Sequence, residues 1–298
     1  MTDSEVDVPN DAADLETAAE VFASVRPRLF GIAYRMLSSA TEAEDLVQDV
    51  WLRWQTYDRS TVRNPAAFLA TTTTRLAINA LTSARARRET YVGPWLPEPV
   101  DTSADPYLGA ERGEALEFAA LLLMEKLSDH ERAAYVLREA FDYPYAQIAE
   151  ILRTSQPAVR QLVSRARKHM AAERRTPVSP AAQRELLVTF LEAARSGDLT
   201  GLEKLFSPDV TSLSDGNGGH QVARTAITGA ARVTKFLAAI SGWFWDDVEV
   251  GWAQTNGQTA AVLRRGGSVY GVLTISASAD GVDQVLWMVN PEKIAAVS

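Results

Sequence analysis

The sequence contains no cysteine among its 298 residues. Disulfides, thiolate zinc sites and thiol-based redox sensing are therefore excluded. Histidine is almost as rare: His130, His169 and His220 lie far apart and offer no spacing that would hold a metal ion. We expect neither a metal site nor a cofactor.

Long hydrophobic runs are also missing, because no stretch of eighteen apolar residues occurs. The N-terminus lacks the basic segment with which a secretory signal peptide begins. We therefore expect a soluble, cytoplasmic protein that does not enter a membrane. Residues 1–18 are acidic, rich in alanine and poor in large apolar groups, so we expect them to form a disordered tail.

The formal net charge is −8 at pH 7, but the basic residues gather in two stretches, 75–88 and 160–175. For nucleic-acid binding, the position of the cations matters more than the overall charge. Neutralisation of phosphates supplies most non-specific affinity for DNA, so an acidic chain with two basic patches should bind DNA weakly alone. It would need a partner that holds it on the duplex.

Residues 143–170 predict two short helices joined by a tight turn. Pro157 suits the start of the second helix, and Arg153 in the turn must take a left-handed backbone or shift the turn. The second helix has an apolar back and a cationic front, which suits the major groove of DNA. The alternative is a helical hairpin with a solvated basic face. The polar residues of the turn and front are Ser155, Gln156, Arg160, Gln161, Ser164, Arg165, Arg167 and Lys168.

An acidic helix is predicted over residues 42–54, with Thr41 as its cap and Glu44 three residues on. Leu46, Val50 and Trp54 fall on its inner face. The outer face is either an ordinary solvated surface or a docking surface for a basic partner. It carries Glu42, Asp45, Gln48, Asp49 and Arg53.

Another helix is predicted to start at Asn64-Pro65 and to extend to residue 89. Aromatic rings, hydroxyls and arginines on one element suit melted DNA, because bases stack on rings while cations follow the backbone. A basic helix end could also simply complement the helix dipole. The residues concerned are Phe68, the threonines 71–74, Arg75, Arg85, Arg87 and Arg88.

The remaining sequence divides at two linkers, 91–110 and 175–182. Trp95 and Leu96 of the first are too apolar for a purely solvated tether, and we expect them to dock on the C-terminal domain or to anchor a loop. Between the linkers we expect a helix from Glu111 and another capped by Ser128. Residues 183–298 predict two helices broken at 196–198, then strands at 210–213, 222–227, 248–252, 260–264, 267–276 and 282–289, with a helix near 230–240. This is an α+β pattern with a curved antiparallel sheet.

Several motifs resemble those of one family. Residues 43–54 (AEDLVQDVWLRW), residues 64–89 and the helix-turn-helix resemble domains 2 and 4 of the sigma-70 superfamily. WLPEP (95–99), DGNGG (215–219) and NPEKI (290–294) resemble signatures of the extracytoplasmic-function (ECF) group that carries a SnoaL-like C-terminal extension. The resemblance covers residues 19–296. It implies a multidomain fold of two all-α sigma domains, a helical bundle (19–90) and a helix-turn-helix domain (111–174), followed by a cone-shaped α+β SnoaL-like domain (183–298).

The resemblance implies an alternative sigma factor, with core RNA polymerase and promoter DNA as partners. The β′ clamp helices and the β flap of the polymerase would be its docking sites. Binding to core would use Glu44, Asp45, Gln48, Asp49 and Trp51. Reading of the −10 element would use Phe68, Thr72, Arg75, Asn79, Arg85, Arg87 and Arg88. Reading of the −35 element would use Ser155, Gln156, Arg160, Gln161, Ser164, Arg165 and Lys168.

Some positions depart from the family pattern. Asn79 and Thr82 stand where the family tends to have Asp and Arg, and Phe68 stands where Trp is frequent, which affects the −10 preference. Gly219 replaces the lysine of the DGGGK signature.

The resemblance also implies regulation in cis, in which the last domain contacts the linker and domain 2. The contacts would come from Trp95, Leu96, Pro97, Asp215, Gly216, Asn290, Pro291 and Lys293. We expect a monomer when free, and a SnoaL-like pocket that could take a small-molecule ligand.

Asp215 and His220 could form an acid–base pair, but without a nucleophile or metal cluster we expect a contact loop and no enzyme. Two alternatives stay open at this point. One is a conventional helix-turn-helix regulator with a ligand-sensing domain, and the other is a SnoaL-like enzyme fused to a DNA-binding module.

Overall fold

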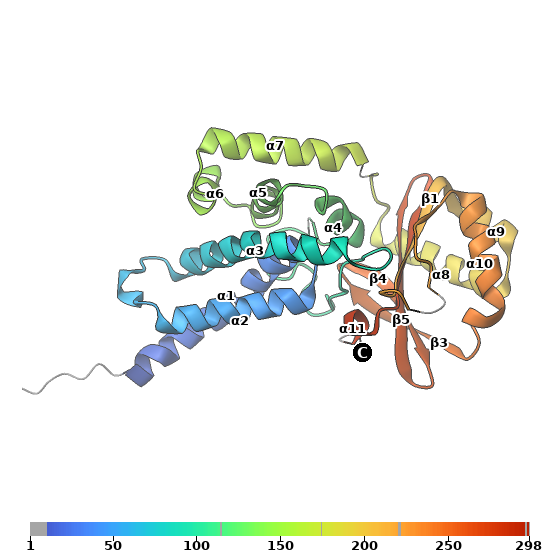
Figure 1. Cartoon of the computed structure of the whole chain (residues 1–298), viewed down its shortest axis with the longest axis horizontal. Coiled ribbons are helices and arrows are strands. Elements are labelled where there is room, and N and C mark those ends of the chain that lie inside the picture. Colours follow the sequence, from blue (N-terminus) through green and yellow to red (C-terminus); the bar gives the residue numbers. More distant parts are fainter. Residues whose placement is uncertain (1–10, 114, 174, 220–221, 296, 298) are drawn as a thin grey trace, which may run out of the picture.

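The structure, a computed structural model, describes residues 11–113, 115–173, 175–219, 222–295 and 297. Helices fill its N-terminal part, and a six-stranded sheet with its own helices forms its C-terminal part beside them (Figure 1). Within the described residues, no helix combines the length and the apolar character needed to cross a membrane.

The first part of the chain folds into three long helices with a single short turn of 3-10 helix between the second and the third. They are α1 (Asp11–Leu37), α2 (Ala40–Thr56), η1 (Arg59–Thr61) and α3 (Pro65–Glu89). The start of α3 is confirmed, because the Asn64 side chain accepts a hydrogen bond from Ala67 N at 3.1 Å and Pro65 is the first helical residue.

The predicted cap of α2 is wrong. Ser39, not Thr41, caps the helix, and its hydroxyl accepts a hydrogen bond from the backbone N–H of Glu42 at 3.1 Å. With the cap two residues earlier, Thr41 lies inside the first turn and forms no capping box with Glu44. Glu44 instead pairs with Arg26 of α1 at 2.5 Å.

The expected tail of residues 1–18 is too long, because α1 begins at Asp11. The added turns are held on the end of α2. Ala18 is buried and its carbonyl accepts a hydrogen bond from Trp54 Nε1 at 3.1 Å, while Asp14 pairs with Arg59. Residues 1–10 lie outside the described residues.

Four further helices form the second helical unit: α4 (Phe118–Met124), α5 (Asp129–Glu139), α6 (Tyr145–Ile151) and α7 (Gln156–Glu173). The helix expected from Glu111 begins only at Phe118, because the backbone N–H groups of Glu111 and Arg112 both donate to the carbonyl of Ala140 at the end of α5. The Ser128 cap of α5 is confirmed, with a capping box to Glu131.

Helices α6 and α7 form the predicted helix-turn-helix. Arg153 in the turn has φ of 52°, so it takes the left-handed backbone conformation that the turn requires. Val159, Val163, Ala166 and Met170 form the buried side of α7.

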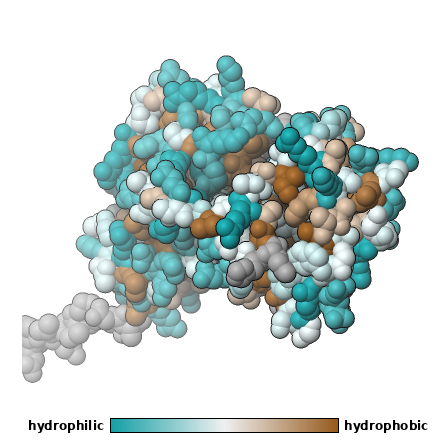
Figure 2. All heavy atoms as spheres, turned by 45° about the vertical axis from the view of Figure 1, so that its right-hand side comes forward, coloured by the Kyte–Doolittle hydropathy of each residue, from teal (hydrophilic) through white to brown (hydrophobic). Residues whose placement is uncertain are grey.

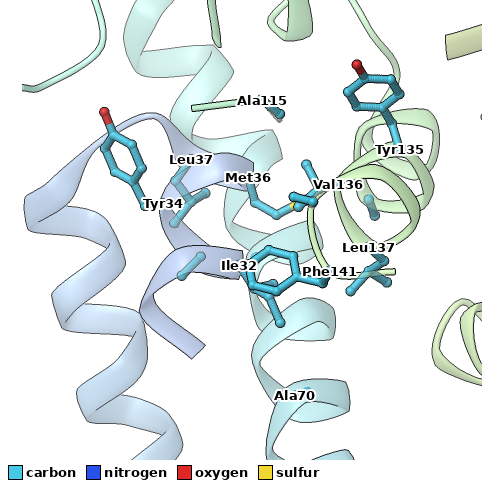
Figure 3. Close-up of a cluster of buried hydrophobic side chains, with 14 of the residues drawn as sticks. Ile32, Tyr34, Met36, Leu37, Ala70, Ala115, Tyr135, Val136, Leu137 and Phe141 are labelled. Atoms are coloured by element: carbon cyan, nitrogen blue, oxygen red, sulfur yellow. The ribbon is translucent and has the colours of Figure 1, made fainter. Parts of the chain in front are cut away.

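The two helical units share one core. Figure 3 shows Met36 of α1 pointing toward Val136 of α5, with Phe141 beside Ile32. All four side chains are buried. The two helical units therefore pack together around a single hydrophobic core.

The C-terminal domain starts at Pro180, slightly before the expected 183. Its elements are α8 (Pro180–Ser196), α9 (Leu199–Leu205), β1 (Phe206–Asp215), β2 (Ile227–Thr228), α10 (Ala230–Phe244), β3 (Val248–Thr255), β4 (Gln258–Arg265), β5 (Ser268–Ser278), β6 (Gly281–Met288) and α11 (Pro291–Ile294). The strand order is β2-β1-β6-β5-β4-β3.

Two expectations for this sheet are wrong. It is mixed, not wholly antiparallel, because β1 runs parallel to β6, with Asp215 opposite Met288. The strand expected over 222–227 is reduced to β2, which pairs with β1 only through Ile227 and Thr228. Val222 is instead packed against Gly216, so the segment before β2 folds onto the end of β1.

The sheet has an apolar core on each face. One core lies under α8, α9 and α10. The other faces the helical body, where Leu96 of the first linker and Phe118 of α4 pack against Val262, Val272 and Leu286. Figure 1 shows α4 and α11 on this side of the sheet. A continuous apolar contact thus joins the C-terminal domain to the rest of the chain.

Candidate nucleic-acid interface and interdomain junction

The acidic face of α2 is accessible. Glu44, Asp45, Gln48 and Asp49 are exposed, and Leu52 beside them is 54% exposed. Trp51 is half-buried, with its ring 5.0 Å from that of Phe22 of α1. An exposed acidic surface with an apolar residue beside it suits a basic protein partner.

The front of α7 is also open to solvent. Ser155, Gln156, Gln161, Ser164 and Lys168 are exposed. Arg160 and Arg165 are exposed too. The Arg160 guanidinium lies 5.4 Å from the Tyr145 ring, and Arg165 pairs with Glu131 at 2.8 Å. The structure therefore brings all seven residues predicted for the −35 element onto one accessible side of the helix-turn-helix.

The residues predicted for the −10 element are divided along α3. Phe68 is half-buried, with its ring 4.5 Å from that of Tyr57 and 5.7 Å from that of Trp54. The Thr72 hydroxyl donates to the carbonyl of Phe68 within the helix, and Asn79 is exposed.

Three arginines of α3 bind the second helical unit. Arg75 donates from Nε to the carbonyl of Ile151 and from Nη2 to the carbonyl of Glu150, both at 2.9 Å. These carbonyls lie at the C-terminal end of α6, where a cation is electrostatically favourable. Burial and, secondarily, Arg153 lower the pKa of Arg75.

Arg85 and Arg88 reach the segment around α4 and α5. Arg85 donates to the carbonyl of Leu127 at 2.5 Å and pairs with Asp129. Arg88 pairs with Glu125, and Arg87 instead pairs with Glu42 of α2 on the exposed surface.

Beneath Arg88, the fully buried Arg132 completes the junction of the two helical units. It donates to Glu125 Oε1 at 2.6 Å, to Ser38 Oγ at 2.6 Å and to the carbonyl of Arg35 at 3.0 Å. Burial lowers the pKa of Arg132 to about 9, and nearby Arg85 acts in the same direction. Glu125 pairs with both arginines, and without it the buried Arg132 charge would lose its carboxylate partner.

The three motifs of the resemblance meet at one buried point. Asp215, which is 0% exposed, accepts hydrogen bonds from Leu96 N at 2.7 Å, from Lys293 Nζ at 2.7 Å and from the Tyr91 hydroxyl. Lys293 also donates to the carbonyl of Leu96 at 2.5 Å, and Asn290 Nδ2 donates to the Tyr91 hydroxyl at 3.0 Å. We call these five residues, Tyr91, Leu96, Asp215, Asn290 and Lys293, the interdomain clasp.

The electrostatics of the clasp follow from its burial. Burial lowers the pKa of Lys293, and the Asp215 carboxylate opposes that shift. Burial and the hydrogen bond to Asp215 raise the pKa of Tyr91, so the hydroxyl stays neutral and remains a donor. Two cations lie over the Trp95 ring. The Arg88 guanidinium is 3.8 Å and Lys293 Nζ is 4.1 Å from the ring centroid.

Other residues named from the resemblance lie near the clasp. Pro97 is buried beside Leu96 in the linker, Gly216 follows Asp215, and Pro291 opens α11 and is exposed. Gly219 donates to the carbonyl of Gly216 at 2.9 Å. His220 lies outside the described residues.

Sequence reasoning missed several residues of this junction. Glu98 accepts from Ser39 Oγ at 2.8 Å and from Thr41 N at 2.9 Å, so the linker places a carboxylate at the N-terminus of α2. Buried Asn256, in the β3–β4 turn, binds Val100 N, the Tyr34 hydroxyl and the carbonyl of Leu116. Glu98 belongs to the WLPEP motif and could have been named, whereas an Asn-Gly turn indicates only a hairpin.

Comparisons with known proteins agree with this arrangement. The Sigma-70 region 2 family matches residues 21–87, and the Sigma-70, region 4 family matches residues 117–170. The ECF RNA polymerase sigma factor SigJ of Mycobacterium tuberculosis is 39% identical over 230 residues, which cover 74% of this chain and 72% of the relative. The probable ECF RNA polymerase sigma factor SigI of Mycobacterium tuberculosis is 28% identical over 273 residues, 90% of this chain and 92% of the relative.

A solved structure resembles almost the whole chain. The crystal structure of the Mycobacterium tuberculosis extracytoplasmic function sigma factor SigJ superposes with a TM-score of 0.74 at 32% identity. The match covers 93% of this chain and 98% of that chain. The likeness therefore includes the C-terminal α+β domain as well as the two sigma regions.

Proposed function

The chain belongs to the ECF RNA polymerase sigma factors, and from this premise we propose that it binds core polymerase and is held closed in cis by its SnoaL-like domain. In this proposal residues 19–90 dock on core and open the −10 region, residues 111–174 anchor at −35, and the last domain controls both. Promoter DNA and core polymerase are the partners.

Docking on the polymerase is assigned to the acidic face of α2. Its support is exposure, because Glu44, Asp45, Gln48 and Asp49 face solvent. The β′ clamp helices are the proposed partner surface, and half-buried Trp51, packed against Phe22, would belong to the contact.

Recognition of the −35 element is assigned to the front of α7, which is equally accessible. We therefore propose that the closed chain can approach both core polymerase and the upstream promoter element. Arg160 and Gln161 are the residues best placed to read base edges, and Lys168 to neutralise a phosphate.

The observation that carries the closed state is the engagement of the −10 arginines. Arg75 donates hydrogen bonds to two α6 carbonyls, and Arg85 and Arg88 pair with Asp129 and Glu125. These three guanidinium groups are turned onto the second helical unit, and we infer that in this position they do not follow the backbone of a melted strand. Opening the −10 region therefore requires α3 to separate from α4, α5 and α6.

The SnoaL-like domain is proposed to hold this state through the clasp. The clasp fixes the first linker, and the linker continues directly from α3 to α4. Glu98 couples the same linker to the N-terminus of α2. We assign the domain a regulatory and not a catalytic role, because Asp215, the acid of the candidate acid–base pair, already accepts three hydrogen bonds in the clasp.

The test is run-off transcription with bacterial core polymerase on a promoter library. We expect initiation that requires both the chain and core, together with weak or absent shift of the same promoters by the chain alone. A strong, specific gel shift without core, and no initiation with it, would instead indicate a conventional helix-turn-helix regulator.

A further inference from the structure

We propose that the cavity of the SnoaL-like domain binds a small, flat, aromatic anion, and that the bound anion strengthens the interdomain clasp. The inference rests on the proposed function, because the clasp matters for transcription only if closure controls the −10 arginines. The ligand would act on the clasp through the backbone segments that the cavity and the clasp share.

The cavity has a volume of about 280 Å³, just below the ~300–1,000 Å³ range that is typical of small-molecule sites. Its lining includes five aromatic side chains, which come from α10, β5 and β6. The Phe244 ring lies 6.0 Å from Trp243, 5.7 Å from Tyr270 and 5.3 Å from Trp287. Figure 2 shows hydrophobic patches on the C-terminal domain, and Trp243 is 38% exposed. Aromatic walls of this size favour a planar ligand that can stack or meet ring edges.

One end of the cavity is positive. Among the described residues that line it, Arg265 alone carries a charge. Its guanidinium donates to the carbonyl of Phe244 at 2.9 Å and lies 4.7 Å from the Tyr270 ring, which leaves further N–H groups for a ligand. The Tyr270 hydroxyl donates to the same carbonyl at 3.3 Å. A carboxylate on an aromatic ring satisfies such a site, because its charge meets Arg265 while its ring meets the walls.

The wall next to the clasp is one residue thick. Ser214 and Gly216 line the cavity, and Asp215 between them belongs to the clasp. Successive residues of a strand point to opposite sides, so the end of β1 has one side in each site. The same alternation occurs after β6, at the NPEKI motif (290–294). Val289 and Pro291 line the cavity, whereas Asn290 and Lys293 belong to the clasp.

The end of β1 and the segment that follows β6 are joined by a backbone hydrogen bond. Val289 N donates to the carbonyl of Asp215 at 2.8 Å. Gly216 packs closely against Val222, because a Cβ added to Gly216 would lie 2.7 Å from Val222 Cγ2. On the opposite side, Gly218 lies against Val92 of the linker. A ligand that fills the cavity therefore supports the backbone that presents Asp215 and Lys293.

The direction of the effect follows from the state of the cavity. It is already formed while the clasp is closed, so a ligand that fits it binds the closed state more tightly than an open state in which the loop is released. Thermodynamic reciprocity then requires that loosening the clasp weaken the ligand. The anion is thus expected to reduce initiation.

The test measures binding to the full chain by calorimetry, with 2-naphthoate as the probe and 2-naphthamide as its neutral counterpart. We expect naphthoate to bind, Arg265→Gln to weaken it about tenfold, and the amide to be insensitive to that change. Arg264→Gln is the matched control, since the neighbouring arginine undergoes the same charge change without lining the cavity. Ile240→Trp should abolish binding of both probes by filling the cavity.

The coupling is tested by Asp215→Asn, which changes the clasp and leaves the cavity lining intact. We expect naphthoate affinity to fall at least threefold, with circular dichroism unchanged. Tyr91→Phe, in the linker, should act in the same direction even if Asp215→Asn disturbs folding.

Absent binding, or binding unaffected by Arg265→Gln and Ile240→Trp, overturns the site. Unchanged affinity in both clasp variants overturns the coupling. Naphthoate binding with the expected variants but unchanged run-off transcription would leave the site in place and count against closure as the control of initiation.

Discussion

Tyr91→Phe tests the clasp by removing one hydroxyl. In the structure this hydroxyl donates a hydrogen bond to Asp215 Oδ1 and accepts one from Asn290 Nδ2. The variant removes both hydrogen bonds. Tyr91 belongs to the linker, whereas Asp215 and Asn290 belong to the C-terminal domain. The loss therefore falls on the contact between them and not on either fold.

The size of the effect can be worked from these contacts. A hydrogen bond to a charged group contributes about 1.5–3 kcal/mol, and the half-buried position of Tyr91 places it at about 1.5 kcal/mol. Since 1.4 kcal/mol is tenfold, the population of the opened clasp should rise about tenfold.

Hydrogen–deuterium exchange reads this directly, because the N–H of Leu96 is hydrogen-bonded to Asp215 and exchanges when the clasp opens. We expect its protection to fall about tenfold, while the amides of β5 and β6 keep theirs. Tyr57→Phe, at the end of α2, is the control and should change neither. Unchanged protection at Leu96, or equal loss across the sheet, would refute the reasoning.

Three further predictions concern other surfaces. Asp49→Lys on the exposed face of α2 should weaken core binding about tenfold without changing the melting temperature, while Glu185→Lys on α8 should change neither. Arg160→Ala should weaken promoter binding by the polymerase complex by about 1–3 kcal/mol, measured by filter binding at several salt concentrations. The control Arg195→Ala, on α8, should leave promoter binding unchanged. Leu96→Ala, at a fully buried position between the linker and the sheet, should lower the free energy of unfolding by about 2–4 kcal/mol in urea, against less than about 0.5 for the exposed Leu52→Ala. Equal losses for the two leucines would contradict the apolar contact between domains.

Local signals in the sequence were enough for most helices. Asn64-Pro65 and Ser128 are capping residues that act through their immediate neighbours, so their helices start where predicted. The prediction of Thr41 as the cap was wrong because Ser39, two residues earlier, can cap the same turn, and the local sequence does not rank the two. The helical turns at 11–18 exist because Trp54 and Arg59 hold them, which is a tertiary effect.

Long-range pairings lay beyond the reach of periodicity. The parallel pairing of β1 with β6 joins segments about seventy residues apart, and no local pattern specifies it. The same holds for Arg75, whose partners lie at the end of α6. The motifs named Asp215, Asn290 and Lys293 as residues of interest, but only the fold reveals that Tyr91 and Glu98 share their surroundings.

If the closed arrangement blocks initiation, a reversible crosslink that locks it should do the same. The chain has no cysteine of its own, and a Cβ built on Gly218 would lie 3.3 Å from the Cβ of Val92, close to the ~3.5–4.5 Å of a disulfide. The variant Val92→Cys/Gly218→Cys would therefore tie the linker to the C-terminal domain when oxidised.

Run-off transcription would compare the oxidised and reduced forms of this one protein with core polymerase, so the backbone strain of a side chain at position 218, where φ is +75°, is common to both. We expect the oxidised form to bind core but to initiate at least tenfold less than the reduced form, and we expect reduction to restore initiation. Equal initiation from both forms, with the crosslink confirmed by mass spectrometry, would contradict it.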